Sequence, residues 1–325
     1  MVPPSFSRSF VLLWLLSVSL GTAVARGAAQ SASAAGQDTD VPPLQSELAA
    51  HEAALATHPQ DRVEQAAAVE VSERLALSAR AAGDRDTALK ILLHAQSLAP
   101  ENTRVLYDLG VLEEEMKLYR DSDKTIARAL ELGSTEPYLL YAAARVKLDL
   151  GQLDPAEQQM KAYLKLRPND ASAHYALGRI YHQGVHPEQA AAEFERSVEL
   201  QPRQTESYFQ LGEIELQQGQ YDDAIKHYTI TVNGDPKHAG AWVGIGIAHF
   251  RQKQYEQALP PLEKAVDLEP AYQPGHYYLG LTLARLGRKD ESAKQLSEAA
   301  RLADIDNQKS MQQLHLLQPS NASPQ

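Results

Sequence analysis

The stretch TESYFQLGEIELQQGQYDDAIKHYTITVNGDPKH, residues 205–238, decides the fold. It holds two segments in which apolar residues recur at spacings of three and four, which predicts two amphipathic helices. Gly219 separates the two segments and Pro236 closes the stretch. Further prolines lie at distances of 34 residues or twice 34 along the chain, at Pro100, Pro168, Pro202 and Pro270. Residues 205–238 are therefore one copy of a repeat built from two helices.

The prolines place seven units at 69–102, 103–136, 137–170, 171–204, 205–238, 239–272 and 273–306. Position 8 is small in every unit, as close contact between two helix backbones requires: Ala76, Gly110, Ala144, Gly178, Gly212, Gly246 and Gly280. Position 24 is large in every unit: Leu92, Ile126, Met160, Phe194, Tyr228, Leu262 and Leu296. Position 15 is glycine in four units, where we expect a helix to end in a left-handed residue: Gly83, Gly151, Gly219 and Gly287.

This pattern resembles the tetratricopeptide repeat family. Tyr208, Gly212, Ala224 and Pro236 stand at family positions in one unit, and Trp242 opens the same pattern in the next. The resemblance covers about 238 of the 325 residues. It implies an all-α fold, an α-solenoid of tandem 34-residue helix-turn-helix units that winds into a right-handed superhelix.

The segments around the repeats have separate predictions. Residues 1–25 join Arg8, an apolar run and Ala23-Val24-Ala25, which predicts a cleavable secretory signal; if it is not cleaved, residues 10–25 are a candidate membrane anchor. Residues 26–43 predict a flexible linker, and residues 44–68 predict an N-terminal capping helix or degenerate repeat. Residues 307–325 predict a C-terminal cap and a disordered tail. The chain is thus expected to be exported, either periplasmic or secreted.

Composition and motifs argue against several classes of function. The net charge of −11 repels a phosphate backbone, so nucleic acid is not an expected partner. The chain has no cysteine, and its 11 histidines fall at different positions of the repeat. It carries no glycine-rich phosphate loop and no recognisable hydrolase or zinc-protease motif. We therefore expect no metal, no cofactor and no enzymatic activity.

In the resembling family, positions 2, 5, 9, 12 and 13 of each unit face a concave groove. Here position 5 carries an aromatic stripe, and aromatic rings can grip an extended peptide or a helix of a partner. Its members are Tyr107, Tyr141, Tyr175, Phe209 and Tyr277. The alternative is that aromatic residues merely fill this position, as they commonly do in the family.

Charged residues accompany the stripe. Position 9 is Arg145, Arg179 and Glu213 in three consecutive units, and position 12 adds His182. Two neighbouring guanidinium groups could clamp a carboxylate through paired hydrogen bonds. The alternative is that Arg179 pairs with Glu213, and Arg145 with Asp149, in solvated ion pairs of small energetic value.

These observations lead to two hypotheses. The first is a non-enzymatic scaffold of the cell envelope, which binds a peptide or helix of another protein in its concave groove. The second is a structural subunit of an envelope or secretion assembly, which packs through its outer helices or its terminal repeats.

Overall fold

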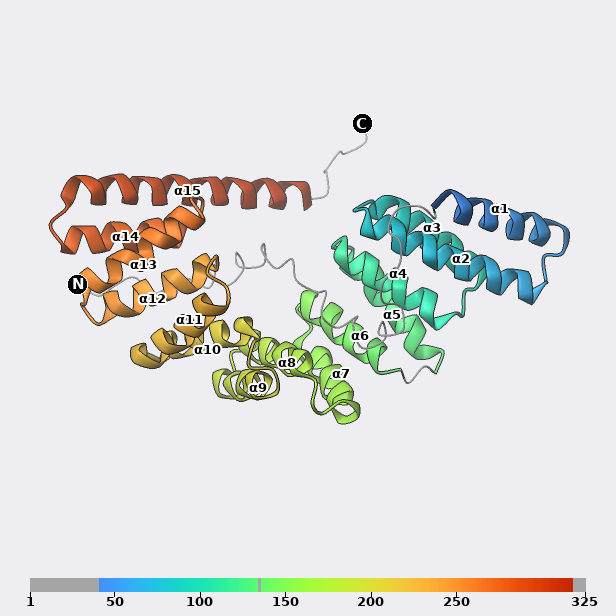
Figure 1. Cartoon of the computed structure of the whole chain (residues 1–325), viewed down its shortest axis with the longest axis horizontal. Helices are drawn as coiled ribbons and strands as arrows, with labels where there is room; N and C mark the ends of the chain where they lie inside the picture. Colours follow the sequence, from blue (N-terminus) through green and yellow to red (C-terminus); the bar gives the residue numbers. More distant parts are fainter. Residues whose placement is uncertain (1–40, 134–135, 318–325) are drawn as a thin grey trace, which may run out of the picture. The chain divides into compact units, whose positions relative to one another are not determined.

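A computed structural model describes residues 41–133 and 136–317. All regular structure in these two ranges is α-helical, as the sequence predicts (Figure 1). The helices are α1 (Val41–Thr57), α2 (Arg62–Ala81), α3 (Arg85–Leu98), α4 (Thr103–Glu115), α5 (Tyr119–Glu131), α6 (Pro137–Asp149), α7 (Leu153–Leu166), α8 (Ala171–Gln183), α9 (Pro187–Leu200), α10 (Thr205–Gln218), α11 (Tyr221–Gly234), α12 (Ala239–Arg251), α13 (Tyr255–Leu268), α14 (Gln273–Arg285) and α15 (Lys289–Leu317).

Two of the predicted segments fall wholly or largely outside the described residues. They are the signal at 1–25 and the linker at 26–43, of which only the last three residues are described. None of the described helices is long and apolar enough to cross a membrane. The chain divides into two compact units, residues 1–118 with α1–α4 and residues 119–325 with α5–α15.

The first unit differs from the predicted boundaries at the starts of its first two helices. Helix α1 begins at Val41, inside the predicted linker, with Pro42 and Pro43 in its first turn. Backbone N–H groups of the first turn have no acceptor within the helix, so proline is well suited to these positions. Helix α2 begins at Arg62, so residues 62–68 extend the first repeat helix and do not belong to a separate cap. The Asp61 carboxylate fixes this start by accepting hydrogen bonds from two backbone N–H groups of the first turn.

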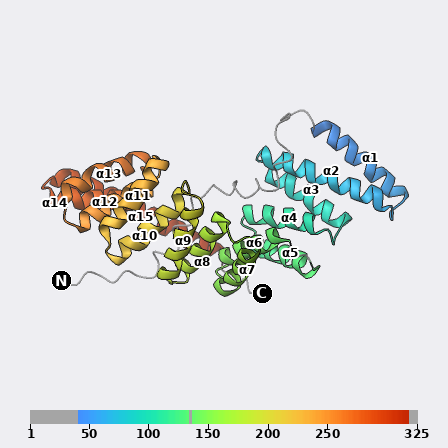
Figure 2. The ribbon, with the colours of Figure 1, turned by 60° about the horizontal axis from the view of Figure 1, so that its bottom comes forward.

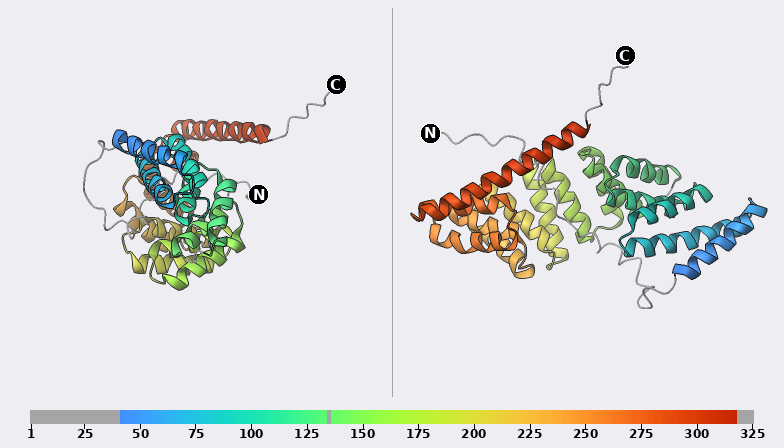
Figure 3. Two further views of the ribbon diagram at one scale, coloured as in Figure 1. Left: turned by 90° about the vertical axis from the view of Figure 1, so that its right-hand side faces the viewer. Right: turned by 90° about the horizontal axis from the view of Figure 1, so that it is seen from above.

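The second unit is a continuous stack of helices. Each helix from α6 to α15 packs on the helix before it, which can be followed from green to red in Figure 2 and Figure 3. Buried side chains run from one repeat into the next, so each repeat covers the apolar face of its neighbour. Helix α15 passes through the predicted boundary at 306–307 without a break, because residues 289–317 contain neither glycine nor proline.

The small residue at position 8 and the large residue at position 24 of the same unit pack against each other. A Cβ added to Gly178 would lie 2.6 Å from the ring of Phe194, and one added to Gly212 would lie 2.8 Å from the ring of Tyr228. Gly246 and Gly280 meet leucines in the same way. The expectation of backbone-to-backbone contact at position 8 is therefore corrected: a side chain of the second helix occupies the space that the glycine leaves.

The turn between the two helices is left-handed in all seven units. The four predicted glycines have φ values between 70° and 82°. The other three units place Lys117, Val185 and Lys253 in the same conformation, with φ values of 63°, 61° and 62°. The turn geometry of the repeat thus overrides the preference of these residues for negative φ values. The β-branched Val185 is the most strained of the three.

Replacing Val185 by glycine is expected to raise the free energy of unfolding by about 1 kcal/mol, because it relieves the left-handed strain. The Val185 side chain is 82% exposed, so little packing is lost. The reciprocal control is Gly219→Val at the equivalent position of the next unit, which is expected to lower stability. Urea unfolding followed by far-ultraviolet circular dichroism measures both, and a less stable Val185→Gly variant would contradict the strain.

Candidate functional site

The predicted aromatic stripe divides into ligand-accessible and buried members. Tyr141 and Tyr175 are half-buried, and each rests on a ring of the second helix of its own repeat. Tyr141 meets Tyr163 edge-on at a centroid distance of 5.2 Å, and Tyr175 lies 5.7 Å from Phe194. Tyr277, on α14, is 43% exposed. Tyr107 is half-buried on α4. It belongs to the first unit and is described separately from the other members of the stripe.

Phe209 does not belong to the accessible set. Its side chain is fully buried, with its ring centroid 5.8 Å from that of Tyr228 and 4.4 Å from that of His238. A phenylalanine has no hydroxyl that needs water or a hydrogen-bond partner, so nothing holds this ring at the surface. The prediction that Phe209 grips a ligand is therefore wrong, and the ring serves the core between α10 and α12.

The basic residues lie on the same helices as the two accessible tyrosines. Arg145 on α6 and Arg179 on α8 are both half-buried. Arg179 makes no ion pair with Glu213, so that predicted pair is not present. His182 lies one turn beyond Arg179 on α8. Burial lowers the pKa of His182, and the charge of Arg179 lowers it further, which favours the neutral imidazole at neutral pH.

Glu213 contacts Tyr228, which the repeat pattern places at position 24, in the core. The Tyr228 hydroxyl donates a hydrogen bond of 2.5 Å to the Glu213 carboxylate. Burial raises the pKa of Glu213, although this hydrogen bond and the charge of His238 act in the opposite direction. Glu213 is thus a half-buried acid whose ionised form is poorly solvated.

The ring of Tyr228 reaches Glu213 by passing between two glycines. A Cβ on Gly212 would lie 2.8 Å from this ring, and a Cβ on Gly244 would lie 2.5 Å from it. Gly244 is at position 6 of its unit, which no repeat rule requires to be small. The repeat register does not predict this contact, although the extra glycine and the tyrosine at position 24 are signals for it in the sequence.

A second acid on α10 is also engaged. His238 Nδ1 accepts a hydrogen bond of 3.0 Å from the Ala241 N–H at the start of α12, and its Nε2 lies 3.6 Å from Glu206 Oε2. Burial lowers the pKa of His238, but the hydrogen bond and charge of Glu206 outweigh it, so the pKa is raised overall. Sequence reasoning missed this pair, because its two residues lie at opposite ends of unit 205–238 and on different helical elements.

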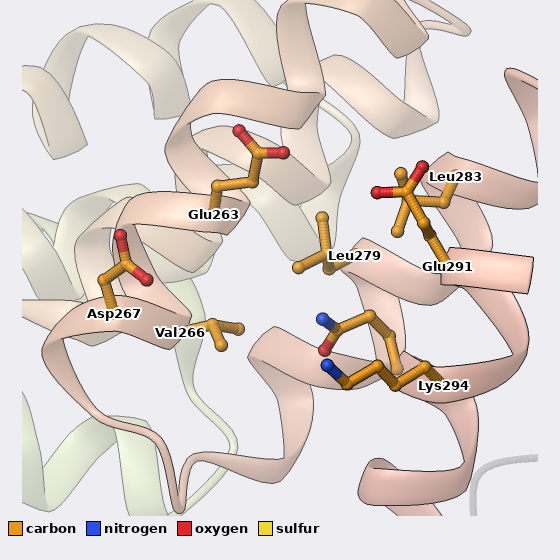
Figure 4. A pocket seen from close by; sticks show the side chains of 8 residues that line it. Glu263, Val266, Asp267, Leu279, Leu283, Glu291 and Lys294 are labelled. Carbon is orange, nitrogen blue, oxygen red and sulfur yellow. The ribbon is translucent and has the colours of Figure 1, made fainter. Parts of the chain in front are cut away.

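A separate pocket lies between α13, α14 and α15 (Figure 4). Its volume is about 370 Å³, and its lining contains three apolar side chains, three carboxylates, a lysine and a glutamine: Glu263, Val266, Asp267, Leu279, Leu283, Glu291, Lys294 and Gln295. One of the carboxylates already has a partner within the chain, because Arg288 donates two hydrogen bonds of 2.5 and 2.6 Å to Glu291. The pocket contains none of the residues predicted for the groove.

Helices α6, α8 and α10 offer aromatic rings, charged groups and hydrogen-bonding groups. Within residues 41–133 and 136–317, no three histidine, aspartate or glutamate side chains are grouped so that they could hold a metal ion.

Comparison with known proteins agrees with the repeat register. The family model of the tetratricopeptide repeat matches residues 141–205, 209–274 and 255–307, which together make up half of the chain. The chain belongs to the tetratricopeptide repeat family. The matched residues include Tyr141, Tyr175, Arg179 and Glu213.

Solved structures of tetratricopeptide repeat proteins and related solenoids share the fold. A protein from Parabacteroides merdae ATCC 43184 is 18% identical, with 72% of this chain and 93% of that chain covered and a TM-score of 0.58. The pilF protein of Pseudomonas aeruginosa is 18% identical, with 65% and 96% covered and a TM-score of 0.57. The hetero-tetramer Cut9-Hcn1 of the APC/C matches at 15% identity, with 80% and 50% covered and a TM-score of 0.59. No protein with a curated function matches the chain.

The raised pKa of Glu213 gives a test of this site. Because ionisation is unfavourable in the folded state, the stability that the group contributes is present below its ordinary pKa of 4.5 and is lost as pH rises through the folded value. Glu213→Gln keeps an acceptor for Tyr228 and removes the ionisation. The stability of this variant relative to wild type is therefore expected to increase as pH rises above 4.5.

Urea unfolding at a series of pH values measures this difference. The control is Glu291→Gln, since the hydrogen bond from Arg288 lowers the pKa of Glu291. Its stability relative to wild type is expected to change with pH in the opposite direction. A pH-independent difference for Glu213→Gln would contradict a poorly solvated carboxylate.

Proposed function

We propose that this tetratricopeptide repeat protein is a non-enzymatic scaffold that binds a segment of another protein on α6, α8 and α10. The observation that carries the proposal is the setting of Tyr141 and Tyr175. Both are half-buried, and each is braced by an aromatic ring of the neighbouring helix. A braced ring loses little conformational freedom on binding, so more of the contact energy appears as affinity.

The fold supports this role in a general way. Solenoids of stacked helix pairs present extended surfaces that suit elongated partners. The similar fold in the Cut9-Hcn1 hetero-tetramer occurs in a protein assembly. For this chain the binding residues are argued from its own side chains, because fold alone does not determine function.

The cellular setting is part of the proposal. The signal predicted at residues 1–25 supports export to the periplasm or the medium, where the scaffold would serve the cell envelope. The alternative is a structural subunit that packs through outer helices or terminal repeats. In that case the half-buried tyrosines would not contribute to association.

The double variant Tyr141→Ala, Tyr175→Ala tests the binding role. Peptides selected by display against the purified wild-type protein are expected to bind the variant at least about tenfold more weakly, because two aromatic contacts are lost. Titration followed by fluorescence anisotropy measures the affinities. The matched control is Tyr221→Ala on α11, where a half-buried tyrosine of a second helix is removed.

Two results would contradict the groove. An equal loss of peptide affinity in the Tyr221→Ala control would show that the loss is not specific to tyrosines on α6 and α8. Selected peptides that bind the double variant as tightly as wild type would favour the structural-subunit alternative.

Processing of the N-terminus tests the cellular setting. We expect the mature protein to begin at Arg26, after cleavage behind Ala25, and to be recovered from the exported fraction. Intact-mass measurement of the protein from fractionated cells gives the answer. Ala25→Arg is expected to prevent cleavage because the peptidase site requires a small residue. A full-length wild-type chain in the cytosolic fraction would contradict export.

A further inference from the structure

Two half-buried ionisable side chains on neighbouring repeats form no ion pair. Arg179 on α8 and Glu213 on α10 occupy position 9 of consecutive units, and neither forms an ion pair with any residue that the structure describes. Other partly buried cations behave differently. Lys147 lies 2.8 Å from Asp123, and Arg80 lies 2.6 Å from Glu115.

The carboxylates of α10 have other contacts. The Tyr228 hydroxyl donates a hydrogen bond to the Glu213 carboxylate, and the ring of Tyr228 packs between Gly212 and Gly244. The other acid on this face of α10, Glu206, lies beside His238. Neither carboxylate forms an ion pair with Arg179.

Two polar residues accompany these charges along the helices. Arg179 lies one helical turn before His182 on α8, and Glu213 lies one turn after Gln210 on α10. These four residues form a polar patch across the two helices. The patch has a fixed positive charge on α8, neutral hydrogen-bonding groups in the middle and a carboxyl group on α10.

We infer that this patch recognises a protein segment that carries an acidic side chain opposite Arg179 and a basic side chain opposite Glu213. The inference rests on the proposed binding function and adds the charge pattern of the partner. Each contact would give a half-buried ionisable group an ion-pair partner, and such charge-assisted contacts are stronger than those between neutral groups.

The two opposite charges of the patch also argue against other kinds of ligand. A phosphate-rich ligand would meet Arg179 but would be repelled by the carboxylates on α10 and by the net charge of −11. A purely basic segment would leave Arg179 unpaired and repelled. A segment that carries both charges pairs with Arg179 through its acidic group and with Glu213 through its basic group. The acidic group is assigned to an Asp or Glu side chain within the segment.

The experiment compares peptide selection by four proteins: wild type, Arg179→Gln, Glu213→Gln and the control Arg196→Gln. Arg196 is an exposed arginine of α9 that pairs with Glu199 at 2.9 Å, away from the patch. Wild type and the control are expected to enrich peptides with one acidic and one basic residue at a constant spacing. Arg179→Gln is expected to lose only the acidic preference, and Glu213→Gln only the basic one.

Affinities of synthetic peptides give a second readout on the unchanged protein. Replacing the acidic residue by its amide, or the basic residue by glutamine, is expected to weaken binding to wild type about tenfold, as for loss of a hydrogen bond to a charged group. The first replacement should have no effect on Arg179→Gln, and the second none on Glu213→Gln. These peptide changes remain informative even if a protein variant unfolds.

Three outcomes would overturn the inference. Peptides that need Tyr175 but show no charge preference would refute it and leave the groove function intact. A preference for acidic or basic residues alone would refute the two-charge pattern. If no selected peptide depends on Tyr175, or if the wild-type protein binds only a second copy of itself, the proposed function fails together with the inference.

Discussion

The contact between the large side chain at position 24 and the glycine at position 8 sets the spacing of the two helices within a repeat. Phe194 on Gly178 and Leu262 on Gly246 show the same arrangement, with no room for a Cβ on either glycine. Because consecutive repeats share their buried side chains, this spacing is passed along the second unit. The faces of α6, α8 and α10 are aligned as a consequence.

The same contact also supplies part of the candidate site. In most units the residue at position 24 ends in the core, but in unit 205–238 it is a tyrosine, whose hydroxyl emerges at Glu213. A second glycine, Gly244, makes room for the ring. One side chain therefore packs against glycines of two repeats and also bonds a carboxylate of the candidate site.

The sequence was sufficient for features that follow the 34-residue register and insufficient for those that depend on how the helices pack together. Periodic prolines and small residues predicted the helices and the left-handed glycines such as Gly219. They could not predict a left-handed Val185, because the turn imposes that conformation against the preference of the residue. The register placed Phe209 on the accessible face, but its burial is decided by Tyr228 and His238.

The charges of the site show the same limit. Spacing suggested an ion pair between Arg179 and Glu213, since both are at position 9. The stronger competitor for Glu213 is a hydroxyl 15 residues away in the chain, and only the packing of the second helix brings it close. Similarly, α2 extends to Arg62 because Asp61 caps it, a local signal that the 34-residue register does not contain.

Site-specific photocrosslinking in the cells that make the protein tests the central claim most directly. A photoreactive phenylalanine analogue would replace Tyr175 on α8 or, for comparison, Ile230, which is 40% exposed on α11. Binding on the first-helix face predicts a discrete crosslinked partner protein from position 175 and none from position 230. Crosslinks from position 230 alone would contradict the account and place the functional surface on the second helices.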